Sequence, residues 1–213
     1  MSATVKQRIA LDQYADLMEE AKLRLQCIDH ALSGQTGLLA PAVREFCFLQ
    51  LRMLCEDVAL GCLTVHGDIG PTAKLRKQYA ADKIISQLER LHPNFYPMAC
   101  TQTCGGPAIY DAQVMKDGYL TKPELLRLYK RCGNHLHRGN IETLFSATGP
   151  HSHPHFPDIE AWRTKMYALL KYHAIFLFNE KQMVLFVLNN IEAKGRVTWA
   201  LLESEEIASL LKS

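Results

Sequence analysis

Residues 41–66 are apolar in almost every direction of a helical projection, and this run constrains the fold more than any other part of the chain. Pro41 suits the first turn of a helix, and Gly67, directly after the run, is a typical helix stop. A helix that is apolar on nearly every side must be covered by other elements, because exposing that surface to water is unfavourable. The run therefore predicts a central helix packed by several neighbours.

The few charged side chains of this run form one polar stripe. Glu45, Arg52 and Glu56 recur at helical spacing, and the separation of Arg52 from Glu56 is that of an ion pair along a helix. Two interpretations stay open. The pair tethers the end of a neighbouring helix, or it supports an active site from inside.

Periodicity and capping signals predict further helices, followed by a small sheet. The expected helices are 4–32, 80–91, one from Thr121 up to a stop at Gly139, 159–172 and 203–211, and the expected strands are 174–178, 183–188 and 196–201. Residues 93–119 show no clear period, so we expect an irregular connection there. The predicted fold class is mainly α, with a helical bundle over 1–145, a linker over 146–157, and an α+β appendage over 158–213 whose three strands form an antiparallel meander.

The composition is that of an ordinary globular protein, with 48% hydrophobic and 22% charged residues. A net charge of +2 gives no global basic field, so binding of nucleic acid requires a local patch. The chain starts without the apolar run of a signal peptide, and charged residues interrupt its longest apolar tract, 46–65, so we expect no membrane span. The odd number of cysteines, seven, and the lack of an export signal favour reduced thiols and a cytoplasmic protein.

The run 129–140 gathers several basic and histidine side chains at the end of one predicted helix. A helical projection places them in two groups: Arg131, His135 and Arg138 on one flank, and Lys130, Asn134 and His137 on the outer face. Histidine moves protons near neutral pH, and a guanidinium binds a phosphoryl group at two points. An RNA 2′-hydroxyl is a built-in nucleophile, so cleavage of a phosphodiester here needs no metal. The other interpretation is an ordinary helix end, where the macrodipole favours basic residues.

The helical layout and the pair Arg131 and His137, with five residues between them, resemble the HEPN superfamily of all-α domains. The run 49–56 also looks like the long central helix of HEPN-like proteins, and the resemblance covers about residues 1–145. It implies a metal-independent endoribonuclease of a toxin–antitoxin or defence system, in which Arg131 and His137 are catalytic and lie in a cleft, often at a homodimer interface. The family usually carries a polar residue directly after the arginine, where this chain has Cys132.

A rival function comes from the C-terminal segment. The predicted strand 183–188 is apolar almost throughout, so both of its faces need cover, either from the bundle or from another chain. A catalytically inert helical module that binds a protein partner through this sheet is therefore the alternative. A homodimer is expected for the ribonuclease, because one protomer offers a phosphate an open surface instead of a cleft.

Two further groups of side chains have the composition of metal ligands. His151, His153 and His155 alternate in a linker rich in proline and glycine, and Cys100 and Cys104 are separated by three residues. The histidines have no carboxylate or thiol at an obvious spacing except Asp158, and the two cysteines lack the further ligands that zinc needs, so we expect no metal and no cofactor. Sequence motifs for nucleotide binding and for common hydrolases are also missing.

Overall fold

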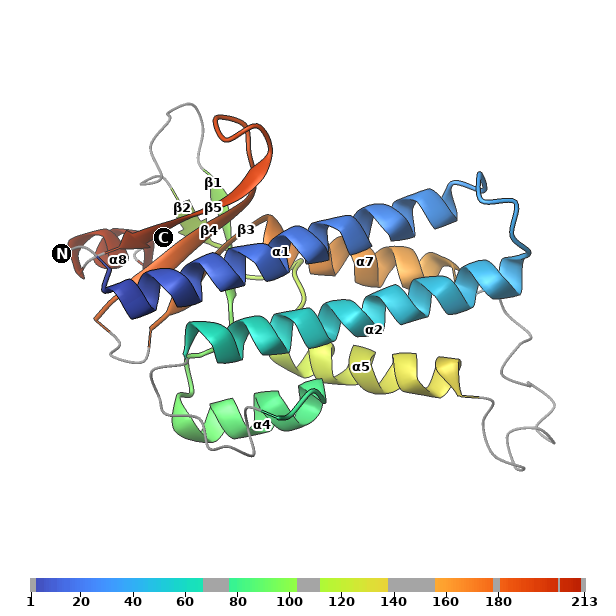
Figure 1. Ribbon diagram of the computed structural model, residues 1–213, viewed down its shortest axis with the longest axis horizontal. Helices are drawn as coiled ribbons and strands as arrows, with labels where there is room; N and C mark the ends of the chain where they lie inside the picture. The colour runs from blue at the N-terminus through green and yellow to red at the C-terminus, as the bar shows by residue number, and fades with distance from the viewer. Residues whose placement is uncertain are drawn as a thin grey trace.

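The computed structural model describes residues 3–66, 77–102, 112–137, 156–177, 181–202 and 204–211. Within these residues, four helices run along the long axis of the molecule, and they are α1 (Val5–Leu32), α2 (Ala40–Val65), α5 (Lys122–Leu136) and α7 (Phe156–Lys171) (Figure 1). A shorter helix, α4 (Ala81–Leu91), packs on α2 and α5. A sheet covered by the last helix, α8 (Ser204–Leu211), lies toward the left end in Figure 1. The mainly α class and the predicted helices are confirmed.

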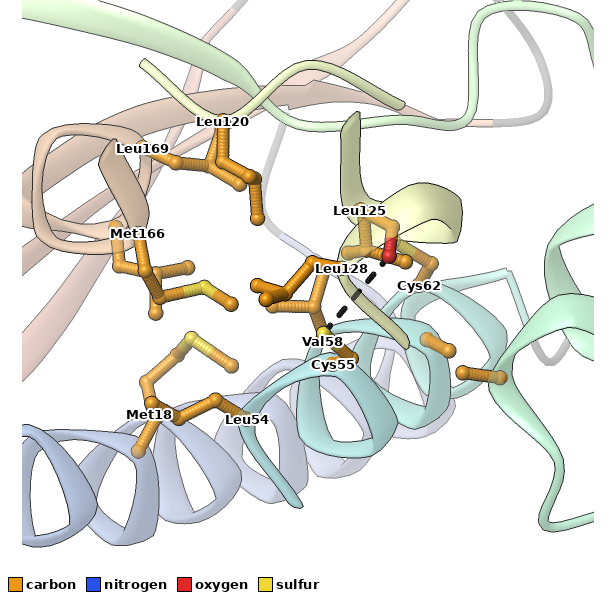
Figure 2. Close-up of a cluster of buried hydrophobic side chains, with 14 of the residues drawn as sticks. Met18, Leu54, Cys55, Val58, Cys62, Leu120, Leu125, Leu128, Met166 and Leu169 are labelled. Atoms are coloured by element: carbon orange, nitrogen blue, oxygen red, sulfur yellow. Dashed lines mark hydrogen bonds between the residues drawn. The ribbon is translucent and has the colours of Figure 1, made fainter. Parts of the chain in front are cut away.

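α2 is the central helix, as its sequence predicted. α1, α4, α5 and α7 all pack against it. Figure 2 shows how side chains of the four long helices converge on one another, with Met18 from α1, Cys55 and Val58 from α2, Leu128 from α5 and Met166 from α7. Fully burying side chains of this size stabilises the fold by roughly 1.5–3 kcal/mol each.

The sheet has five strands, so the predicted three-stranded meander was too small. The strands are β1 (Met98–Gln102), β2 (Ala112–Val114), β3 (Tyr172–Phe176), β4 (Met183–Asn190) and β5 (Arg196–Leu202), in the order β2-β1-β3-β4-β5 with every neighbouring pair antiparallel. β1 and β2 come from the stretch in which we expected an irregular connection. They are short, and β1 is held by pairing Met98 with Ala174 and Ala99 with His173, far away in the sequence. A local period cannot reveal a strand that is fixed by so distant a partner.

Both faces of β4 are covered by this chain itself. Val184, Phe186 and Leu188 belong to the large core that the long helices form. Met183 and Leu185 belong to a second cluster on the other face, which Ile207 and Leu210 of α8 complete. The apolar strand 183–188 is therefore buried without a partner chain.

The segments 1–145 and 158–213 share this sheet, because β1 and β2 come from the first segment and the other strands from the second. Most of the linker 146–157 lies outside the described residues. Of the helices in the described part of the chain, none has the length and apolar character needed to cross a membrane.

Candidate functional site

The predicted basic cassette lies on the last turns of α5. The helix starts with a capping box in which Thr121 donates from its backbone N–H (3.0 Å) and its hydroxyl (2.9 Å) to the Glu124 carboxylate. Leu125, Tyr129 and Cys132 are buried and form the face of α5 that packs into the large core. The helix ends at Leu136, whereas the predicted stop at Gly139 lies outside the described residues.

The outer face of the cassette is open to solvent, as predicted. Lys130, Asn134 and His137 are all exposed. Arg127, one turn earlier, has 71% of its side chain exposed and reaches only to 3.8 Å from Glu124. His137 is the C-cap residue, and its backbone N–H donates to the Gly133 carbonyl over 3.1 Å. This face therefore presents exposed basic side chains and an imidazole together.

The predicted flank group is less uniform than the helical projection implied. Arg131 is half-buried and forms an ion pair with Asp158, in the first turn of α7. His135 turns the other way and stacks on Phe48 of α2, with the ring centroids 4.0 Å apart and the planes 10° from parallel. Arg138, the third predicted member, lies outside the described residues. The arginine and the histidine of this flank thus contact different helices.

The side chains of Arg131 and His137 do not project from the same face of α5. Six residues at about 100° per residue leave them roughly 120° apart around the axis, on either side of the exposed face. Asn134 lies between them. A phosphate that both side chains contact must therefore lie over the outer face, or the second contact must come from another copy of α5.

Arg52 and Glu56 are mostly buried and paired, as the spacing predicted. Their side chains are 28% and 15% exposed, and Arg52 Nε lies 3.3 Å from Glu56 Oε1. Tyr129 of α5 completes the group. Its hydroxyl accepts from Arg52 Nη2 over 2.9 Å and donates to Glu56 Oε1 over 3.2 Å. The Arg52 and Glu56 part of the polar stripe thus contacts α5 through Tyr129, at the start of the cassette.

The neighbouring ionisable groups have strongly shifted pKa values. Hydrogen bonds from Lys165 and from the Thr121 backbone lower the pKa of Glu124 to about 2, so this carboxylate stays charged. Burial raises the pKa of the Cys132 thiol to about 12, which keeps it protonated and makes it a poor nucleophile. The residue after Arg131 is therefore a core residue in this chain.

The possible metal ligands are not brought together by the described residues. Cys100 is buried in β1, where burial raises the pKa of its thiol to about 12. Cys104, His151, His153 and His155 lie outside the described residues. Over the described ranges, no three His, Cys, Asp or Glu side chains are grouped as a metal site.

Sequence reasoning missed three participants of this site. Asp158 and Phe48 contact α5 from helices that are distant in the chain, so no local sequence pattern predicts these contacts. Gly133 carried a local signal, because a glycine inside a helix is unfavourable unless a neighbouring group occupies the space that a side chain would fill.

Comparison of this chain with protein-family models, with curated proteins and with solved structures finds no match.

Proposed function

We propose that this chain is a HEPN-like effector that binds RNA at the C-terminal end of α5 and cleaves it without a metal. The observation that carries the proposal is the concentration of exposed basic side chains on one helix end. Arg127, Lys130 and His137 all face solvent there. Of the nearby acidic side chains, Glu124 binds Lys165 and lies 3.8 Å from Arg127, and Asp158 pairs with Arg131 of the proposed site. A local surface of this kind attracts a polyanion although the net charge of the whole chain is only +2.

The chemistry follows from the two residue types. His137 takes the proton of a ribose 2′-hydroxyl, whose oxygen attacks the adjacent phosphorus. The bond from phosphorus to the 5′-oxygen breaks, and that oxygen receives a proton from water as it leaves. The products are a 2′,3′-cyclic phosphate and a 5′-hydroxyl. Arg131 stabilises the charge that builds on the phosphoryl oxygens, while Lys130, Asn134, His135 and Arg138 are the proposed substrate-binding residues.

The positions of Arg131 and His137 favour a site shared by two protomers. Because they lie roughly 120° apart on α5, a homodimer that brings two such helix ends together offers Arg131 of one protomer and His137 of its partner to the same phosphate. Repulsion between the two basic surfaces weakens such a dimer at low ionic strength. We expect it to tighten with salt or with bound RNA, since both screen that repulsion.

The alternative, an inert module that binds a protein through its sheet, has weaker support. It was motivated by the apolar strand 183–188, and both faces of that strand are covered by the large core and by α8. This surface does not need a partner chain for burial.

The proposal is tested by incubating the purified protein with short single-stranded RNA in the presence of a chelator. We expect cleavage to persist, to yield 2′,3′-cyclic phosphate ends, and to vanish on a strand with 2′-deoxyribose. His137→Ala should abolish cleavage with folding intact. His30→Ala is the matched control, because His30 is also an exposed histidine at the end of a helix. Cleavage that the His137 substitution leaves unchanged rejects the mechanism, and absence of RNA binding favours the inert module.

A further inference from the structure

We infer that Arg52 of α2 is a second phosphate-binding guanidinium of the proposed site, acting through a gap on α5 that Gly133 creates. The inference rests on the proposed function and adds a residue from another helix to it. Tyr129, Gly133 and His137 follow one another at intervals of four along one face of α5. The gap is the space on this face, between the Tyr129 and His137 side chains, that Gly133 leaves empty.

Two partners orient the Arg52 guanidinium. Nε is held by the Glu56 carboxylate at 3.3 Å, and Nη2 donates to the Tyr129 hydroxyl over 2.9 Å. The guanidinium carbon also lies 4.4 Å from the centre of the Tyr129 ring. Nη1 is the nitrogen left over, and within the described part of the chain it has no hydrogen-bond acceptor. A guanidinium fixed at two nitrogens loses little further freedom when the third one binds.

The remaining nitrogen points to the gap. A Cβ built at Gly133 would lie 3.3 Å from Arg52 Nη1, and apart from the neighbouring residues and backbone of α5 itself, no other described atom lies within 4 Å of it. Glycine inside a helix costs roughly 0.5–1 kcal/mol relative to alanine. The chain bears that cost at a position of α5 that the Arg52 guanidinium approaches.

His137 lies next to the gap. It follows Gly133 by about one helical turn, which is close to 5.4 Å along the axis. Side chains on a helix lean toward its N-terminus, so we expect the imidazole to lean toward Gly133. Arg52 therefore lies on the same side of α5 as His137, whereas Arg131 lies on the opposite flank. Since the Arg52 side chain is 28% exposed, a phosphate beside His137 can reach it.

The experiment compares Arg52→Gln and Gly133→Ala with the wild-type protein in single-turnover cleavage of a short RNA. Arg52→Gln should slow cleavage by about a hundredfold or more, as expected when one oriented donor is lost. Gly133→Ala should slow it by roughly tenfold, because the new methyl group displaces Nη1 by a few tenths of an ångström. The melting temperature of Gly133→Ala should stay equal or rise, since alanine favours the helix. A purely structural role cannot produce slower cleavage together with unchanged or higher stability.

Arg163→Gln is the matched control. Arg163 also joins two helices, through Asp29 of α1, and its side chain is similarly buried at 24% exposure. We expect it to cleave at the wild-type rate. Wild-type rates in both Gly133→Ala and Arg52→Gln, with His137 still essential, would overturn the Arg52 inference alone. A wild-type protein that does not cleave RNA, or a His137→Ala variant that does, would overturn the proposed function and this inference with it.

Discussion

Replacing Gly61 by alanine should destabilise the fold, because the new methyl group must displace a buried aromatic ring and break its hydrogen bond. Gly61 lies near the C-terminal end of α2, facing α1. A Cβ at this position would lie 2.7 Å from Tyr14 Cε2 and 3.0 Å from Tyr14 Cδ2, so the ring must move. That ring is completely buried, and its hydroxyl lies 2.7 Å from His173 Nε2. His173 Nδ1 lies 3.0 Å from the Leu170 carbonyl, so the neutral ring donates there and accepts from Tyr14.

Three effects set the magnitude. Inserting a methyl group into a packed core costs about 1–3 kcal/mol. Breaking the hydrogen bond leaves a buried hydroxyl and a buried imidazole nitrogen without partners, which costs about 1–3 kcal/mol more. Alanine returns about 1 kcal/mol through its higher helix propensity. We therefore expect Gly61→Ala to lower the free energy of unfolding by about 1–5 kcal/mol. For a chain of this size each 1 kcal/mol lowers the melting temperature by about 2–4 °C.

Urea unfolding followed by circular dichroism measures the change, with the m-value checked for constancy. Gly133→Ala is the matched control, because its new Cβ meets only the flexible tip of Arg52, and it should be neutral or stabilising. Tyr14→Phe supplies a second check. In that background the hydrogen bond is already gone, so Gly61→Ala should cost about 1–3 kcal/mol less. A Gly61→Ala variant as stable as the wild-type protein would refute the reasoning.

Three further predictions follow from the ionisable groups. Burial lowers the pKa of His173 to about 4, so between about pH 6.5 and pH 4 the unfolded chain binds a proton that the folded chain does not. The free energy of unfolding should therefore fall as the pH drops through that window. An NMR titration should find the His173 ring still neutral at about pH 5. Glu124→Gln should lose about 1–2 kcal/mol at pH 7, because it weakens the cap and the contact with Lys165. Since the pKa of Glu124 is lowered to about 2, the wild-type advantage over this variant in urea unfolding should shrink as the pH falls from about 4.5 toward 2. Glu56→Ala should lower the free energy of unfolding by about 1–2 kcal/mol in the same assay. This is less than the roughly 3–5 kcal/mol lost when one partner of a fully buried pair is removed, because Arg52 can still reach water. A change near zero would show that the pair does not stabilise the fold.

Local patterns predicted most of the helices. The apolar run 41–66 required a central helix, and α2 is one. The capping box at Thr121 marked the start of α5 to within one residue. These features depend on neighbours within one or two turns, so they can be recognised in the sequence alone.

The sheet could be predicted only in part. β3, β4 and β5 were found because short, largely apolar runs joined by short connections favour adjacent strands. β1 and β2 escaped, because their pairing depends on β3, which follows α5 and α7 in the chain. Which chain covers β4 was also beyond the sequence, and only the positions of α8 and of the long helices answered it.

For the candidate site, the sequence by itself determined which chemistry is available: the basic side chains and histidines of 129–137, their order around one helix, and the pairing of Arg52 with Glu56. The tertiary structure decided which of these side chains lie together. It turned Arg131 toward Asp158 and His135 toward Phe48, and it placed Arg52 against Gly133. Helical periodicity assigns a side chain to a face, but the partner on that face comes from another helix, and its identity depends on how the whole core packs.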